Sequence, residues 1–272
     1  TQRTSSGFTT GTWSYSTDGT SFTNFGSAIA PPTSFALASS GTTTGLDGAA
    51  TGYLRYTLSG ATNATGNNRI DNLQLTAISA GAMPTVGSSA TSGTTTFTGN
   101  LSLDGNAQLT AAGGGTVAFS GIIADGIDGA KGITKIGAGT VVLSGTNTYD
   151  GVTAVTAGTL VVNGDQSGAT GAVTVSNTGS RLMGTGTLGG NTIINTGAIH
   201  SAGAATGAVG TQVFAGDLTY SSGAIFEWDL NANLDGDGAG IDNGTAGTDF
   251  DNVNVTGTVT ASSGSIFKVV FG

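Results

Sequence analysis

The chain has 272 residues, 49 of them glycine and none cysteine, and this lack of cysteine excludes disulfides and thiolate metal sites. Sixteen acidic and seven scattered basic residues give a net charge of −9, which argues against a nucleic-acid partner, because phosphates require clustered Lys and Arg. No apolar run reaches the roughly 18 residues of a membrane span, so no span is expected in this chain.

The residue types favour β-strands from end to end. Thr and Val are abundant, and β-branched side chains fit a pleated surface better than a helix. Glycine costs about 1 kcal/mol relative to alanine in a helix interior. Disorder is disfavoured, because 37% of the residues are hydrophobic and stand in alternating runs. We therefore predict an all-β protein.

Residues 1–78 are rich in aromatic side chains and predict antiparallel strands. The segment 12–22 predicts a hairpin around the Asp18-Gly19 turn, and 53–58 and 69–75 predict a second pair. The phrases STDGTSF, YLRYTLSGAT and NNRIDNLQLTA, at 16–22, 53–62 and 67–77, resemble the second half of a jelly-roll module of bacterial secreted surface proteins. Such a module needs eight strands, so we expect an incomplete jelly-roll-like β-sandwich with an open edge.

Three aromatic residues of this module, Trp13, Tyr15 and Tyr56, have two interpretations. They form the core of the sandwich, or they form a platform on which a sugar ring stacks. Aromatic alternation in a sandwich favours the core. Residues 79–94, which are small and include Pro84, predict a linker.

From residue 95 onward the sequence repeats a short phrase. A Gly-Thr pair followed by hydrophobic alternation occurs at 115–121, at 139–145 and at 158–164, with spacings of 24 and 19 residues. Recurrence at about 20 residues with glycine at the corners indicates stacked coils. We predict a parallel β-helix over 95–272, with roughly six coils of about 20 residues between 95 and 211.

The block 135–164 resembles the autotransporter-associated β-strand repeat, also called the passenger-associated transport repeat. Three features carry the resemblance: GAGT with LSG at 137–145, NTY at 147–149, and AGTL with NG at 157–164. The resemblance implies a right-handed parallel β-helix exported to the bacterial surface, where the repeat serves export, folding and display. An extracellular or cell-surface location follows from it.

Seven of the 16 acidic residues lie between 227 and 251, where we expect an acidic loop. Within it Asp235, Asp237 and Asp242, with Gly236, partly follow the oxygen spacing of a calcium-binding loop. Asp is also a common turn residue, so a solvated loop between strands is the alternative that we favour. We expect neither a resident metal nor another cofactor.

Other chemistry has little support in the sequence. The lone His200 lacks the Cys, the second His and the nucleophile that zinc sites and catalytic triads require, so a surface or coil-corner role is expected. The acids of the coil region mostly neighbour glycine, which favours a role in turns: Asp104, Asp125, Asp128, Asp150, Asp165 and Asp217. We name no catalytic residue and expect no enzyme.

The sequence therefore favours an extracellular structural protein, a β-helical rod that builds or decorates a bacterial surface fibre or layer. Both ends read as cropped from something longer, and head-to-tail strand sharing between subunits would complete them. An adhesin that binds surface glycans is the alternative, and a polysaccharide-degrading β-helix enzyme is a weaker one.

Overall fold

The computed structural model describes residues 1–36, 41, 43, 45–46, 49, 51–63, 67–70, 83–127, 129–230 and 245–271. Every regular element in these residues is a β-strand, so the all-β prediction is confirmed. The described part contains no helix of the length and hydropathy needed to cross a bilayer.

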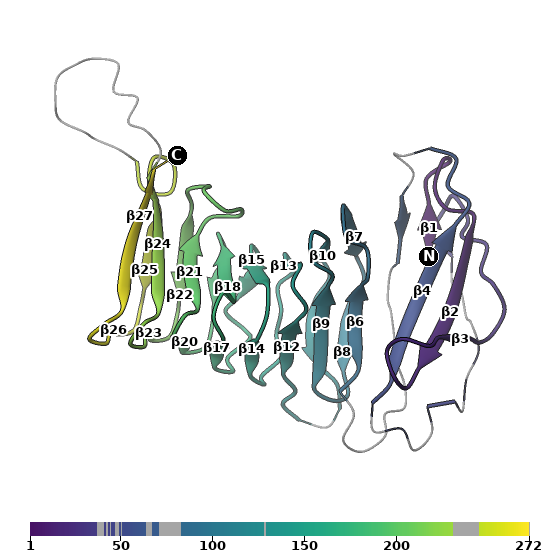
Figure 1. Cartoon of the computed structure of the whole chain (residues 1–272), viewed down its shortest axis with the longest axis horizontal. Coiled ribbons are helices and arrows are strands. Elements are labelled where there is room, and N and C mark those ends of the chain that lie inside the picture. Colours follow the sequence, from purple (N-terminus) through teal and green to yellow (C-terminus); the bar gives the residue numbers. More distant parts are fainter. Residues whose placement is uncertain are drawn as a thin grey trace, which may run out of the picture.

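Most of the chain winds into a parallel β-solenoid, whose strands stand side by side in Figure 1. Two sheets of eight strands run its full length. The first contains, in spatial order, β7 (Thr94–Phe97), β10 (Thr116–Phe119), β13 (Thr140–Leu143), β15 (Thr159–Val162), β18 (Arg181–Gly184), β21 (Ile199–Ala202), β24 (Ile225–Leu230) and β27 (Ile266–Phe271). The second contains β6 (Thr85–Ser88), β9 (Ala107–Ala111), β12 (Ile133–Ile136), β14 (Thr153–Val155), β17 (Val173–Val175), β20 (Thr192–Ile194), β23 (Leu218–Tyr220) and β26 (Val259–Ala261).

Shorter strands form the third side of the solenoid. Near its beginning β8 (Leu101–Leu103) pairs with β11 (Ile123–Asp125). Toward its end a four-stranded sheet contains β16 (Asp165–Gln166), β19 (Thr187–Leu188), β22 (Thr211–Phe214) and β25 (Asn252–Val255). All of these pairs are parallel. One coil, which we call a rung, therefore contributes one strand to each of the two long sheets, and most rungs contribute a further strand to the third side; the rung of β12 and β13 does not.

The repeated phrases of the sequence are neighbours in the first sheet. Thr116 pairs with Thr140 and Thr140 with Thr159, and the following residues stay in register. Six strands of this sheet begin between residues 94 and 199, which agrees with the six coils predicted for that region. The parallel stacking predicted from the Gly-Thr phrases is confirmed.

Side chains that alternate along these strands fill a continuous interior. Val117, Val141 and Leu160, which stack in register, are each 0% exposed. At the N-terminal end the rings of Phe97 and Phe119 stack with their centroids 5.0 Å apart. Burying a side chain of this size stabilises a fold by about 1.5–3 kcal/mol, so the stacked interior is the main source of stability.

Glycine columns line the corners between the strands. A Cβ added at Gly121, Gly145, Gly164 or Gly186 would lie 2.1–2.3 Å from the carbonyl oxygen of a glycine one rung earlier. A second column contains Gly171, where a Cβ would lie 2.0 Å from Gly151 O. Because a side chain would push neighbouring rungs apart, the repeated Ser-Gly and Asn-Gly steps are a packing requirement.

The N-terminal residues form a separate antiparallel unit, drawn in purple and blue in Figure 1. Its three-stranded sheet has the order β3 (Thr23–Asn24), β2 (Thr10–Ser16), β4 (Tyr53–Ser59), and β1 (Gln2–Arg3) pairs with β5 (Asn68–Arg69). The predicted hairpin around Asp18-Gly19 is confirmed, with its second strand beginning at Thr23. Ile70, which directly follows β5, forms a parallel β-bridge with Phe97 of β7 and packs against the core of the solenoid.

Two expectations about this region differ from the structure. The strand at 53–58 was expected to pair with 69–75, but β4 pairs with β2 along its whole length, and Arg69 pairs with Gln2. The linker expected over 79–94 contains β6, the first strand of a solenoid sheet. The small residues there were read as a linker, but a Cβ added at Gly87 would lie 1.9 Å from Thr110 O, so close stacking requires glycine at this position.

The corner glycines give a direct test of the stacking. We expect Gly145→Ala to lower the free energy of unfolding by about 1–3 kcal/mol, because the new Cβ would overlap Gly121 O. Gly113→Ala is the matched control, because a Cβ there meets nothing closer than 3.6 Å. Urea unfolding followed by circular dichroism measures both, and equal effects of the two substitutions would contradict the packing requirement.

Candidate functional site

The central rungs bury a lysine. Lys135 follows Ile133 on the inward face of β12 and is 0% exposed. Its Nζ donates to three carbonyl oxygens, those of Ile136 at 2.9 Å and of Gly137 and Ala157 at 2.8 Å. Burial lowers the pKa of Lys135 to about 8. The ammonium ties the corner after β12 to the corresponding corner one rung later.

A second corner of the same rungs is held by buried amides. The Asn147 side chain accepts the Ile123 N–H at 2.7 Å and donates to Gln166 Oε1 at 2.6 Å, and Gln166 donates to Gly145 O at 2.9 Å. Nearby, Tyr149 is 2% exposed and its hydroxyl lies 2.7 Å from Thr153 Oγ1. These bonds join three successive rungs, so the polar residues of the block act as internal ties.

His200 lies inside the solenoid, and the expected surface or corner position is wrong. The side chain is 0% exposed and its ring stacks on Phe226 at 5.3 Å. Nδ1 is 2.6 Å from the Tyr220 hydroxyl and Nε2 is 2.8 Å from Gln212 Oε1. A neutral ring that accepts from Tyr220 and donates to Gln212 satisfies both contacts. Burial lowers the pKa of His200 to about 4.

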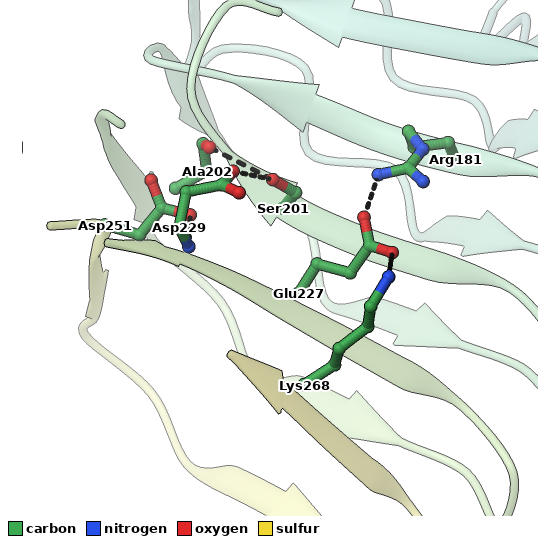
Figure 2. Close-up of polar contacts among 7 residues, drawn as sticks. All are labelled: Arg181, Ser201, Ala202, Glu227, Asp229, Asp251 and Lys268. Atoms are coloured by element: carbon green, nitrogen blue, oxygen red, sulfur yellow. Dashed lines mark hydrogen bonds and ion pairs between the residues drawn. The ribbon is translucent and has the colours of Figure 1, made fainter. Parts of the chain in front are cut away.

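A cluster of charged side chains crosses the C-terminal rungs, as Figure 2 shows. Glu227 on β24 accepts from Arg181 on β18 and, at 2.9 Å, from Lys268 on β27. The side chains of Glu227 and Arg181 are 10% and 16% exposed, whereas Lys268 is 57% exposed. Burial raises the pKa of Glu227, but the two cations outweigh it and the pKa is lowered overall.

Two further carboxylates lie beside this triad. Asp229, which is 3% exposed, accepts the Ser201 hydroxyl at 3.0 Å. Asp251, which is 2% exposed, accepts the backbone N–H groups of Gly210 at 2.9 Å and of Asp229 at 3.0 Å. Glu227 and Asp229 were assigned to an acidic loop, but both lie within strand β24. Their role in the structure is therefore to link rungs.

The sequence-based candidates for ion or sugar binding have separate outcomes. Asp235, Asp237 and Asp242 lie outside the described residues. Among the residues that are described, no three His, Cys, Asp or Glu side chains come together as a metal site.

The aromatic candidates pack within the N-terminal unit. Trp13 and Tyr56 lie opposite each other on β2 and β4, with ring centroids 4.8 Å apart, and both are half-buried. Tyr15 lies 6.1 Å from Phe25, measured between ring centroids.

Of the acids expected to act in turns, Asp125 and Asp217 accept backbone N–H groups near the corners, and Asp128 lies outside the described residues. Asp125 accepts the N–H groups of Lys131 at 2.7 Å and Asp150 at 2.9 Å. Asp217 accepts the Thr258 N–H at 2.8 Å. Each carboxylate therefore satisfies backbone donors that no strand reaches.

The triad of Arg181, Glu227 and Lys268 allows the stability contribution of a buried ion pair to be compared with that of an exposed one. We expect Glu227→Gln to lower the free energy of unfolding by about 3 kcal/mol, because it leaves the largely buried Arg181 without a counter-charge. Lys268→Met should change it by less than about 1 kcal/mol, since Lys268 is solvated. Chemical denaturation measures both, and a larger loss in Lys268→Met would contradict this assignment.

The buried histidine predicts a pH dependence. Because the pKa of His200 falls from 6.5 to about 4 on folding, its contribution to stability is present above pH 6.5 and is lost as the pH falls through 4. His200→Leu removes this titration. The free energy of unfolding of wild type, relative to that of the variant, should therefore fall by about 3 kcal/mol between about pH 7.5 and 4. Denaturation at several pH values measures the gap, and a constant gap would refute the prediction.

Comparison with known families places the passenger-associated-transport-repeat over residues 133–162. Neither the curated proteins nor the solved structures provide a match to the chain. The matched residues comprise β12 to β15, with Lys135, Asn147 and Tyr149 among them. The chain thus contains a passenger-associated transport repeat, which forms the central rungs of a parallel β-solenoid.

Proposed function

We propose that this protein is an extracellular structural protein, a β-solenoid rod that builds or decorates a fibre or layer on a bacterial surface. The observation that carries the proposal is the transport repeat in the middle of an unbroken parallel ladder. The repeat and the fold together fit a surface-associated β-helical protein. Eight strands at a spacing of about 4.8 Å span about 34 Å, a length suited to a spacer.

The free edge of β27 supports assembly into a fibre. The strand pairs with β24 on one side, and no described residue pairs with its other side. Phe267 and Phe271 on this strand are 62% and 76% exposed, and Val259 on β26 is 56% exposed. Backbone groups and apolar side chains are thus both available to a further strand. We propose that another copy of the chain supplies it.

The charge distribution favours head-to-tail over tail-to-tail contact. Residues 212–272 hold eight of the 16 acidic residues and one basic residue. Residues 1–70 hold three of the seven basic residues and two acidic ones. Two acidic C-terminal ends repel each other, whereas the N-terminal unit complements that end in charge. A heterologous contact of this kind builds open filaments.

A proline in the terminal strand tests this edge. Ile266 N–H bonds to Ala224 O, so the alternating backbone direction of a strand turns the N–H of Val269 toward the free edge. Val269→Pro should therefore remove a donor needed for strand addition without breaking the ladder to β24. Val269→Thr, which keeps the N–H, is the matched control.

Electron microscopy and sedimentation of the purified chain measure the outcome. We expect concentration-dependent linear assemblies for wild type and Val269→Thr, and monomers for Val269→Pro. Uniformly monomeric wild-type particles would refute fibre building. Immunogold labelling of intact cells of the source bacterium tests surface display separately, and exclusively internal labelling would refute the extracellular role.

A further inference from the structure

On its β21 side, the edge of β24 beyond Phe226 pairs with no named strand of the described residues. β21 and β24 pair only through Ile199 with Ile225 and His200 with Phe226. Further along β24, Asp251 bonds to both the backbone N–H and the backbone carbonyl oxygen of Asp229. Its Oδ2 accepts the Asp229 N–H at 3.0 Å, and its own N–H donates to Asp229 O at 2.9 Å. One aspartate thus replaces a missing strand partner.

The same residue joins two other strands to this point. Its second carboxylate oxygen, Oδ1, accepts the Gly210 N–H at 2.9 Å, directly before β22. Its carbonyl accepts the Trp228 indole N–H at 2.7 Å, and the next residue, Asn252, donates to Gly210 O at 2.8 Å. Asp251 therefore holds β22, β24 and β25 together directly before β25.

The surroundings of Asp251 supply no compensating cation. Asp229 and Asp251, side by side in Figure 2, are 3% and 2% exposed, and neither forms an ion pair with any described residue. The nearby cations, Arg181 and Lys268, are both bonded to Glu227. Among the described residues, the two carboxylates accept from the Ser201 hydroxyl and from backbone N–H groups, and the charges of Glu227, Arg181 and Lys268 also act on Asp229.

We propose that Asp251, held beside Asp229 by a bond to its backbone N–H, is a proton-binding site whose own contribution to the stability of the C-terminal rungs is larger in mildly acidic than in neutral solution. Two buried like charges without a counter-ion repel each other, and one proton removes the repulsion. This inference does not depend on the proposed function, because it concerns the internal stability of the solenoid.

The direction of the effect follows from the pKa. Burial raises the pKa of Asp251 from 3.8 to about 6, with the charge of Asp229 adding to the rise and the N–H groups of Asp229 and Gly210 opposing it. The folded state therefore binds the proton more tightly than the unfolded state. The resulting stability is fully present below pH 3.8 and is lost as the pH rises through 6.

Trp228 provides a local probe of this site. The chain has two tryptophans, and Trp13→Phe leaves only Trp228, whose indole N–H bonds to Asp251. In that background we expect the emission of Trp228 to change with a midpoint near pH 6. Asp229→Asn, which keeps an oxygen for Ser201, should move the midpoint toward 3.8 by removing the neighbouring charge.

Two further variants complete the experiment. Asp251→Asn should abolish the transition, and Asp104→Asn, the same change at an exposed residue of a distant rung, should leave it in place. If Asp251→Asn does not fold, the proposal is still tested by the pH midpoint of Trp228 emission in the Trp13→Phe chain, compared with and without Asp229→Asn. A midpoint at or below about pH 4 with both carboxylates present, or one unmoved by Asp229→Asn, would overturn the proposal.

Discussion

The fold depends on the hydrogen-bonded ladder between successive rungs. A single rung has short strands and buries little by itself, whereas a rung between two others gains backbone partners on both edges and covers for its apolar side chains. The register of Thr116, Thr140 and Thr159 shows how closely one rung copies the next. The corner glycines allow that approach, because any larger residue would meet a carbonyl oxygen at about 2 Å.

Polar groups inside the solenoid follow the same principle. Lys135, Asn147 and His200 are all fully buried, and each bonds to groups on neighbouring rungs or corners. Because an unpaired buried polar group is costly, such residues fix the stacking in a single arrangement. The acidic residues of β24 extend this principle to the C-terminal rungs, where Glu227 has two cations and Asp229 has none.

Much of the solenoid could be predicted from the sequence, because its repeat places glycine and hydrophobic residues at spacings that few other folds require. The buried polar residues could not be predicted in this way. His200 was expected at the surface or at a coil corner, and no buried role was predicted for Lys135, since charge and polarity usually indicate exposure. Their position in the alternation was the available signal, because Lys135 follows Ile133 at an inward position. Strand partners in the N-terminal unit were also mispredicted, because pairing between distant segments leaves no local pattern.

Rungs of unequal length share one ladder. Arg181 and Ile199 are ladder neighbours only 18 residues apart, whereas Ile225 and Ile266, also neighbours, are 41 residues apart. Both pairs of strands keep the ladder register. Since the strands of each rung pair only with those of the rungs before and after it, duplication or deletion of a gene segment that encodes one rung would change the length of the rod in steps and leave most of the remaining contacts intact.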